Sequence, residues 1–279
     1  MILVTGASGN SGSKVIEVLR RRHLPFRIAL RQVAAPEELK FDFMDPSTWP
    51  EALAGTKGVF LVRPPAIANM AKTLTPFVDA VRDHRAGPIV FLSVAGAEKK
   101  PFLPHAKVEK RLLAGGESDF TILRSSYFAQ NLEDAFLADI RDEGRIVLPA
   151  GSGRVAFVDL RDVAEVAADA LGGDASLAGK AVTLTGPRAV DFDEVAALVT
   201  AAAGRPVRYE PVSPFAYWRH LRRKHEPAIQ VLVKTILNTG LRFGQAEKVD
   251  PALPRLLGRA ATDVAEYIRI NAAVWRLQG

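Results

Sequence analysis

Three evenly spaced glycines, Gly6, Gly9 and Gly12, stand near the start of the chain in the stretch TGASGNSG. The apolar run ILV precedes them and the amphipathic stretch KVIEVL follows, so the pattern predicts a strand, a tight turn and a helix. Such a turn leaves N–H groups unpaired at the start of the helix, where the helix dipole adds partial positive charge. This chemistry favours an anion such as a phosphate; the alternative is a glycine-rich turn without a ligand.

Glycine suits this turn for physical reasons. It tolerates unusual backbone angles, lets a ligand approach bare backbone, and allows a helix to pack tightly on a strand. Ser8, Asn10 and Ser11 add side-chain donors or helix caps within the same stretch.

Composition narrows the classes of chemistry further. The 279 residues contain no cysteine, which excludes disulfides, thiolate nucleophiles and cysteine-held zinc or iron–sulfur clusters. Met1 runs directly into the first strand and no apolar stretch approaches the length of a membrane span, so we expect a cytoplasmic protein with no membrane partner. The net charge of +6 fits an anionic cofactor or substrate and gives only weak support to nucleic-acid binding.

The elements that would position these residues alternate along the chain. Apolar runs recur at FRIAL, LKFDF, GVFLV, PIVFLSV and DFTILR, and helical patterns such as MAKTLTPFVDAVRDH and HAKVEKRLLAGG lie among them. This alternation predicts an α/β fold with a doubly wound parallel sheet of the Rossmann type. We expect residues 1–150 to form the dinucleotide-binding domain. Residues 151–279 would form a smaller, mostly helical C-terminal substrate lobe, partly interleaved with the first domain.

The end of the second predicted strand bears on the choice of dinucleotide. An acidic residue there usually binds the ribose hydroxyls of NAD, whereas an arginine accommodates the extra phosphate of NADP. From Phe26 to Pro36 there is no carboxylate, and Arg31 falls at the tip of the strand. The sequence therefore predicts NADP(H) as the cofactor with Arg31 on its 2′-phosphate; the alternative is that Arg31 is a solvated loop charge.

Several stretches taken together resemble one known family. TGASGNSG, FDFMDPSTW, LVRPP, FLSVAGAEK, PHAKVEKRLL, FTILRSSYFAQNL and FVDLRDVAEVAADAL are similar to the NmrA-like atypical short-chain dehydrogenase/reductases, the group that includes triphenylmethane reductase-like and quinone reductase-like enzymes. The similarity covers nearly the whole chain and is weakest from about Pro211 to Val249.

The resemblance implies roles for particular residues. Thr5 to Gly12 would hold the pyrophosphate, and Asp42 with Phe43 would flank the adenine. The ribose and nicotinamide side would be lined by residues after three further strands, namely Val62, Arg63, Pro64, Ser93, Val94, Tyr127 and Phe128. Tyr127 and Phe128 would close over the nicotinamide.

The proton donor of the mainstream enzymes of this superfamily is missing. These enzymes use a tyrosine with a lysine four residues later, which lowers the tyrosine pKa. None of the four tyrosines of this chain has a lysine at that spacing. This favours hydride transfer to an electron-poor acceptor such as a quinone, an enone or a cationic dye. His105 stands where relatives carry a lysine or histidine and is our candidate catalytic acid; the alternative is a residue that begins its helix. Lys107 is expected to be a solvated charge.

Other features favour structural interpretations. The basic segment FAYWRHLRRKHEP is predicted to be an amphipathic helix with Trp218 and Leu221 on one face, and a lid over the substrate is the next alternative. Asp159 and Asp162 are expected to cap a helix, so no metal site is predicted. The sequence predicts an NADPH-dependent oxidoreductase acting on a small molecule. It leaves open a cofactor-sensing regulator, a non-redox isomerase or cyclase, a homo-oligomer and a protein partner.

Overall fold

The computed structural model describes residues 1–64, 67, 69–115 and 118–276, and the chain divides into two compact units. The first unit contains Met1–Ser125 and Leu160–Leu184, and the second contains Ser126–Asp159 and Thr185–Gly279. The chain therefore leaves the first unit after residue 125, returns at residue 160 and leaves again after residue 184. None of the helices in the described part of the chain is long and apolar enough to cross a membrane.

The first unit is built on a seven-stranded sheet in the order β3-β2-β1-β4-β5-β6-β8, in which every neighbouring pair is parallel. The strands are β1 (Ile2–Val4), β2 (Phe26–Leu30), β3 (Glu38–Lys40), β4 (Gly58–Val62), β5 (Ile89–Val94), β6 (Phe120–Ser125) and β8 (Lys180–Leu184). This order reverses between β1 and β4, which is the switch point where doubly wound folds bind ligands. The predicted doubly wound fold is confirmed.

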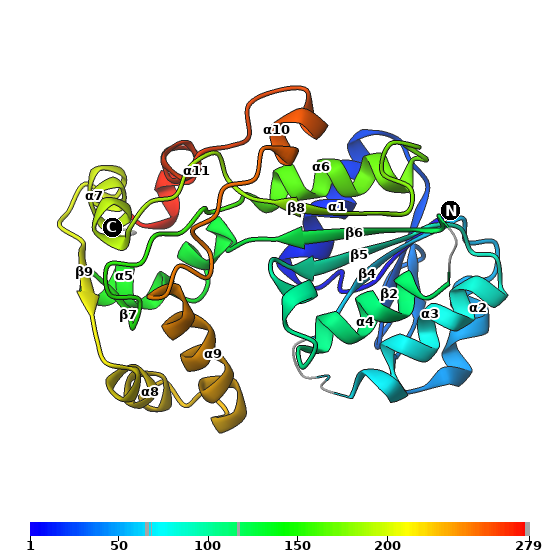
Figure 1. Ribbon diagram of the computed structural model, residues 1–279, viewed down its shortest axis with the longest axis horizontal. Coiled ribbons are helices and arrows are strands. Elements are labelled where there is room, and N and C mark those ends of the chain that lie inside the picture. Colours follow the sequence, from blue (N-terminus) through cyan, green and yellow to red (C-terminus); the bar gives the residue numbers. More distant parts are fainter. Residues whose placement is uncertain (65–66, 68, 116–117, 277–279) are drawn as a thin grey trace. The chain divides into compact units, whose positions relative to one another are not determined.

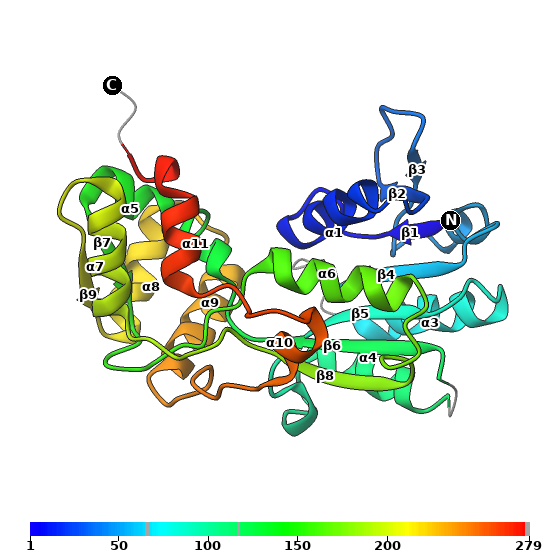
Figure 2. The ribbon, with the colours of Figure 1, turned by 90° about the horizontal axis from the view of Figure 1, so that it is seen from above.

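Helices cover both faces of this sheet. Figure 1 shows α1 (Asn10–Arg21) and α6 (Leu160–Leu171) on one face, with α2 (Trp49–Leu53), α3 (Leu74–Asp83) and α4 (Pro104–Leu113) on the other. The view from above shows α1 and α6 side by side, in agreement with their contacts (Figure 2). Helices on both faces explain why the inner strands are almost continuously apolar: GVFLV and IVFLSV are buried along most of their length.

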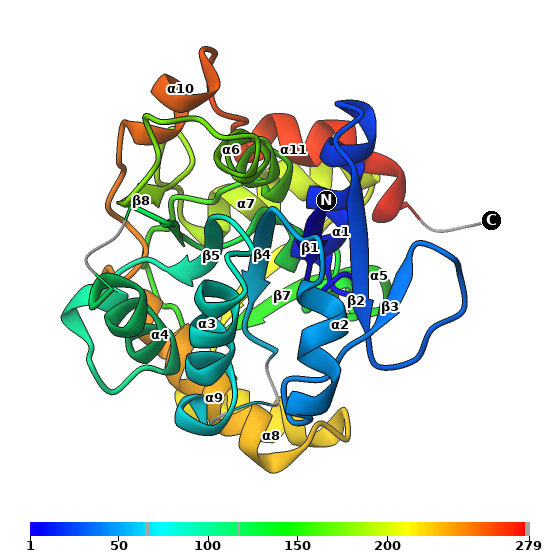
Figure 3. The ribbon, with the colours of Figure 1, turned by 90° about the vertical axis from the view of Figure 1, so that its right-hand side faces the viewer.

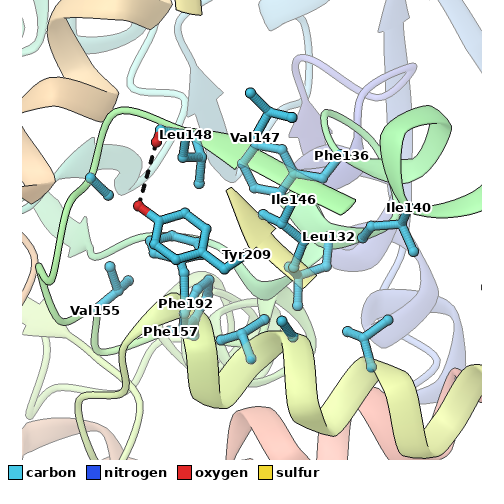
Figure 4. Close-up of a cluster of buried hydrophobic side chains, with 14 of the residues drawn as sticks. Leu132, Phe136, Ile140, Ile146, Val147, Leu148, Val155, Phe157, Phe192 and Tyr209 are labelled. Atoms are coloured by element: carbon cyan, nitrogen blue, oxygen red, sulfur yellow. Dashed lines mark hydrogen bonds between the residues drawn. The ribbon is translucent and has the colours of Figure 1, made fainter. Parts of the chain in front are cut away.

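The second unit is mostly helical. It contains α5 (Leu137–Glu143), α7 (Phe192–Ala203), α8 (Pro214–Arg223), α9 (Ala228–Leu241), α10 (Ala252–Leu257) and α11 (Val264–Ile270), with the parallel pair β7 (Arg145–Leu148) and β9 (Arg208–Pro211). Its core is drawn in Figure 4, where Phe157, Phe192 and Tyr209 pack together and the Tyr209 hydroxyl donates to the Leu148 carbonyl at 3.4 Å. Figure 3 shows α8 and α9 next to each other, and their residues are in contact.

The observed division differs from the expected boundary at residue 150. Residue 150 lies inside the second unit, while α6 and β8 belong to the first. The physical reason is that β8 pairs in parallel with β6, and the buried face of α6 packs against α1 and the strands β4, β5 and β6. Two elements that were expected in the C-terminal lobe therefore complete the sheet.

Candidate functional site

The glycine-rich turn connects β1 to α1 and requires glycine at two positions. Gly6 has a φ of 66°, and a Cβ added there would lie 3.1 Å from the Val62 Cβ. A Cβ on Gly12 would lie 2.3 Å from the Gly6 carbonyl oxygen. A change of side-chain rotamer could not remove this clash, because the atom it meets belongs to the backbone. These two glycines therefore close the turn and let α1 approach β1.

Gly9 has a different reason to be glycine. It is the N-cap of α1 with extended backbone angles, φ −100° and ψ 167°, which any residue can adopt, and it is exposed. Its missing side chain leaves the first turn of a 12-residue helix uncovered, and that turn contains no acidic residue. The first N–H groups of a helix lack intrahelical acceptors, so this end forms a cradle that fits the pyrophosphate of a dinucleotide.

The Thr5 side chain is committed to the fold. It is fully buried, its Oγ1 donates to the Phe60 carbonyl at 2.9 Å, and it accepts from the Val62 N–H at 3.0 Å. These bonds join the end of β1 to the end of β4. The Thr5 hydroxyl is therefore used within the fold, and the expected part of Thr5 in holding the pyrophosphate stays a prediction.

Arg31 follows β2 directly and is exposed. Because β2 lies beside β1 in parallel, Arg31 and the glycine turn stand at the same edge of the sheet. The two glutamates that come next in the sequence have other partners: Glu37 pairs with Arg20 at 3.3 Å, and Glu38 accepts from the N–H groups of the loop before it. Within the described residues Arg31 has no ion-pair partner, so its charge is available to an anionic ligand.

The loop after β3 contains Asp42 and Phe43. The ring of Phe43 is only 5% exposed and meets Phe41 and Phe77 edge to face, at ring centroid distances of 4.8 and 5.4 Å. Phe43 is therefore a core residue, which is at odds with its side chain flanking the adenine. Asp42 is half-buried, and its carboxylate accepts from the Met44 N–H at 2.8 Å.

A buried polar network lies at the carboxyl ends of β5 and β6. Ser93, 1% exposed, donates from Oγ to Glu109 Oε1 at 2.5 Å, and Glu109 forms an ion pair with Arg124 at 2.6 Å. Ser93 and Arg124 are register partners on the two strands, and Glu109 reaches them from α4. The sequence analysis did not predict this role for Glu109. The available signal was a polar residue near the end of each of two neighbouring apolar strands, Ser93 in β5 and Arg124 in β6. Val94 is half-buried at the end of β5.

His105 and Arg63 lie near each other in the first unit. The Arg63 guanidinium donates from Nη1 to the carbonyls of Pro64 and Ile67, at 3.2 and 2.7 Å. Burial, assisted by the positive charge of Arg63, lowers the pKa of His105 to about 4. The lowered pKa favours a neutral imidazole at neutral pH, because removing a charge from water favours the neutral form. The role of His105 as catalytic acid stays a prediction. Lys107 is exposed, as predicted.

Tyr127 and Phe128 belong to the second unit, just after β6 ends. The Val158 N–H donates to the Tyr127 carbonyl at 2.9 Å. Phe128 forms an isolated parallel β-bridge with Val158. The Tyr127 hydroxyl donates to Asn238 Oδ1 at 2.9 Å, and burial raises the pKa of this phenol well above its usual value. Tyr127 therefore stays protonated over the physiological range.

The basic segment forms α8, but its buried face is not the expected one. Tyr217 and Leu221 are buried, whereas Trp218 is 37% exposed and stacks on the exposed Phe215 with ring centroids 6.2 Å apart. The buried residues are therefore four positions apart and not three. Tyr217 can be buried because its hydroxyl accepts a hydrogen bond from Asn238 at 3.1 Å. Asp159 directly precedes α6 and accepts from Gln130 at 2.8 Å.

A cavity of about 450 Å³ in the first unit lies away from these residues. It is lined by Arg82, Pro88, Asp119 and neighbouring residues, at the amino ends of β5 and β6. Ligands of doubly wound folds bind at the opposite, carboxyl edge, so we do not assign the cofactor to this cavity. Among the described residues no group of histidine, aspartate and glutamate side chains could hold a metal ion.

The model of the NmrA-like family matches residues 1–268. Prestalk A differentiation protein A of Dictyostelium discoideum is 32% identical over 96% of this chain and 91% of its own length. An NAD(P)H azoreductase of Xenophilus azovorans is 29% identical over 99% of both chains. Among solved structures, the Citrobacter sp. triphenylmethane reductase complexed with NADP(H) is similar with a TM-score of 0.85 at 24% identity, covering 97% of this chain and 99% of that one.

Proposed function

Because the chain belongs to the NmrA-like family, we propose that it is an NADPH-dependent oxidoreductase that reduces a small, apolar or electron-poor organic acceptor. The acceptor class that we propose includes quinones, enones, azo compounds and cationic dyes. Hydride transfer would take place without a tyrosine–lysine dyad.

One observation carries the choice of cofactor. The uncovered start of α1, preceded by the Gly6–Gly12 turn, shares its edge of the sheet with the exposed Arg31, which stands where NAD-binding proteins of this fold place a carboxylate. A dinucleotide pyrophosphate fits the first feature, and the additional phosphate of NADP fits the second. The azoreductase and the triphenylmethane reductase support this proposal through the cofactors in their names.

NADPH supplies a hydride when bound. The residues of the protein would bind the cofactor, orient its nicotinamide and polarise the acceptor. The turn would hold the pyrophosphate and Arg31 the 2′-phosphate. The carboxyl end of β5 would lie along the nicotinamide side. There the Ser93 hydroxyl donates its hydrogen to Glu109, so it can accept further hydrogen bonds but cannot donate one. The neutral His105 can donate an N–H hydrogen bond without losing a proton.

The test is NADPH oxidation followed by absorbance of the reduced nicotinamide. The protein is mixed with NADPH and a panel of quinones, enones, azo dyes and cationic triphenylmethane dyes, and NADH replaces NADPH as the control. We expect at least one acceptor to oxidise NADPH faster than NADH. Tight NADPH binding with no oxidation by any acceptor in the panel would reject the proposed activity.

One observation supports a second candidate function, a cofactor-binding regulator. The relative in Dictyostelium discoideum is named for differentiation, not for a reaction, and it matches over nearly its whole length. A regulator would bind NADPH tightly, show no turnover and retain a protein partner on purification, so the same assay separates the two candidates.

A further inference from the structure

Helix α9 has apolar residues on two opposite sides, and only one of these sides is buried. Val231 and Leu241 pack into the core of the second unit, and Asn238 is buried on the same side. The opposite side is a stripe of exposed aliphatic residues at the helical spacing i, i+3, i+4, i+7 and i+8, namely Ile229, Leu232, Val233, Ile236 and Leu237. A stripe of this width ordinarily packs against another element, so an exposed one indicates a surface for a partner.

The neighbouring helix α8 has exposed aromatic rings among arginines. Its buried side consists of Tyr217 and Leu221. The opposite side consists of exposed residues at the spacing i, i+3, i+4 and i+7, namely Phe215, Trp218, Arg219 and Arg222. Tryptophan and phenylalanine together with arginine are typical of helices that lie at the boundary between water and lipid.

The two exposed sides belong to one surface of the second unit. Helices α8 and α9 are in contact (Figure 3), and the buried apolar residues of both belong to the same hydrophobic cluster. The Asn238 side chain also donates to the Tyr217 hydroxyl at 3.1 Å, which joins the two helices. Because both helices bury one side in this shared core, their opposite sides point away from it together. We call these two sides, with the residues named for each, the α8–α9 surface.

Positive charge is concentrated in the same segment. Residues 214–243 contain six lysines and arginines and one acidic residue, Glu226, which leaves a formal charge of +5 against +6 for the whole chain. Glu226 is itself paired with Lys234 at 2.6 Å. Among the residues that the structure describes, the exposed Arg219, Arg222 and Arg223 have no ion-pair partner. The α8–α9 surface therefore combines apolar side chains with positive charge that is available to an anionic partner.

We propose that the α8–α9 surface binds a membrane that contains anionic lipids. The aliphatic stripe and the aromatic pair enter the boundary between the headgroups and the acyl chains, and the arginines contact the lipid phosphates. Binding of this kind needs no membrane-spanning helix, whereas the expectation that the chain has no membrane partner rested on the lack of a spanning stretch. The proposal does not depend on the reductase function.

A second copy of the chain and a nucleic acid fit the α8–α9 surface less well. A symmetric dimer would bring the surface against itself, so the arginines of the two copies would face each other, which is unfavourable. A nucleic acid would neutralise the arginines, but its interfaces with proteins are polar and would leave the aliphatic stripe without an apolar environment. Of the three partners, only an anionic membrane offers both negative charge and hydrocarbon.

The first test measures how much of the full-length protein sediments with lipid vesicles. We expect binding to vesicles of phosphatidylcholine mixed with phosphatidylserine, little binding to phosphatidylcholine alone, and weaker binding as the salt concentration rises. Absence of binding to the mixed vesicles, or equal binding to both kinds of vesicle, would overturn the proposal.

The second test removes the charge. Arg219→Gln, Arg222→Gln and Arg223→Gln together should weaken binding to the mixed vesicles about a hundredfold, because each basic residue near an anionic surface contributes about fivefold. The matched control removes the same charge from other helices and loops, with the exposed residues replaced by Arg85→Gln, Lys110→Gln and Arg255→Gln. Equal losses in the two triple variants would assign the binding to net charge and not to the α8–α9 surface.

The third test removes the apolar contact. Ile229→Gln with Ile236→Gln should weaken vesicle binding at least about tenfold, because two aliphatic side chains would no longer be buried in lipid. Both residues are exposed, at 67% and 62%, so the fold should be unaffected. The control is Leu113→Gln with Ile270→Gln, which changes two exposed aliphatic residues of other helices. Unchanged binding by Ile229→Gln with Ile236→Gln would show that the stripe does not enter the membrane.

Trp218 provides a spectroscopic readout of insertion. The other two tryptophans of the chain, Trp49 and Trp275, are buried, so Trp218 is the one that lipid can reach. Its fluorescence should shift to shorter wavelength with the mixed vesicles and should be quenched by lipids brominated on their acyl chains, and Trp218→Phe should abolish both effects. Unchanged fluorescence of vesicle-bound protein would overturn the proposal.

Two further measurements distinguish the other partners. A dimer detected by size-exclusion chromatography without lipid, and lost with Ile229→Gln and Ile236→Gln, would assign the α8–α9 surface to a second copy of the chain. Tighter binding to double-stranded DNA than to the mixed vesicles, lost with the three arginine substitutions, would assign it to a nucleic acid. Either result would overturn the proposal.

Discussion

The proposed preference for NADPH over NADH rests on one residue, Arg31. A hydrogen bond to a charged group contributes about 1.5–3 kcal/mol, and each 1.4 kcal/mol is about tenfold in affinity. We therefore expect Arg31→Ala to raise the dissociation constant for NADPH about ten- to a hundredfold and to leave that for NADH within about threefold. Calorimetric titration measures both. Arg27→Ala is the control, because Arg27 lies toward the amino end of the same strand; a loss of NADH affinity equal to that of NADPH would contradict the assignment.

His105 should make the stability of the fold depend on pH. Its pKa is lowered to about 4 from 6.5, so the unfolded chain binds more protons than the folded one between these values. The stabilising contribution of the neutral imidazole is therefore complete above pH 6.5 and is lost as the pH falls toward 4, by at most about 3 kcal/mol. Urea unfolding at pH 7.5 and pH 5 should show a smaller difference for His105→Gln than for the wild type or for His84→Gln, an exposed control. Equal pH dependence in all three proteins would contradict the shifted pKa.

The role of a residue can be predicted from the sequence where it follows from local backbone conformation. It cannot be predicted where the side chain contacts a residue far away in the sequence. Gly6 and Gly12 are readable because only glycine fits their positions, and Arg31 because it follows its strand directly. Thr5, Phe43 and Ser93 have side chains committed to Phe60, Phe77 and Glu109, which are 16 to 55 positions away for the two hydroxyls. No local pattern reveals such pairings.

At the scale of elements, the turn between β1 and α1 contains two glycines that the fold requires, Gly6 and Gly12, and one, Gly9, that we propose serves the ligand. A Cβ on Gly12 collides with backbone at 2.3 Å, whereas one on Gly9 meets the Gly6 oxygen only at 3.4 Å. We expect Gly9→Ala to change the free energy of unfolding by less than about 1 kcal/mol and to weaken NADPH binding at least about tenfold, because the methyl group stands where the pyrophosphate must approach backbone.

The matched variant is Gly12→Ala, which should both destabilise the protein and weaken NADPH binding. Urea unfolding and calorimetric titration on the two variants give the comparison. If Gly9→Ala bound NADPH as tightly as the wild type, the phosphate would not lie against the start of α1.

The helices and strands were easier to predict than the unit to which each of them belongs. The alternation of apolar runs and helical patterns indicated a parallel sheet, but the strand at AVTLTG was expected in the C-terminal lobe, and the structure pairs it with β6. A short apolar strand looks the same whichever sheet it completes. Helix α9 is harder still, because aliphatic residues such as Ile229 and Ile236 are exposed, while Asn238 is buried on the same helix as Val231 and Leu241. Its apolar residues therefore do not form one buried stripe.

At the scale of the whole molecule, the first unit is assembled from two separate segments of chain. Residues 1–125 alone would lack α6 and β8. The loss would leave β6 as an edge strand, paired only with β5, and would expose the apolar surfaces of α1 and the sheet against which the buried face of α6 packs. Exposed edges and apolar faces of this kind favour aggregation. The boundary suggested by the start of the second sequence rhythm, near residue 150, cuts off the same two elements.

We therefore expect residues 1–125, expressed alone, to aggregate or to lack a cooperative unfolding transition. Residues 1–125 joined to residues 160–184 by a flexible glycine–serine linker of about ten residues should instead remain monomeric and unfold cooperatively in urea. The joined chain keeps the glycine turn and Arg31 on a complete seven-stranded sheet, so it should also bind NADPH. Size-exclusion chromatography, urea unfolding and calorimetric titration test these expectations in turn. Cooperative unfolding of residues 1–125 alone would show that α6 and β8 are additions to a finished domain, in which β1–β6 and α1–α4 supply the stability.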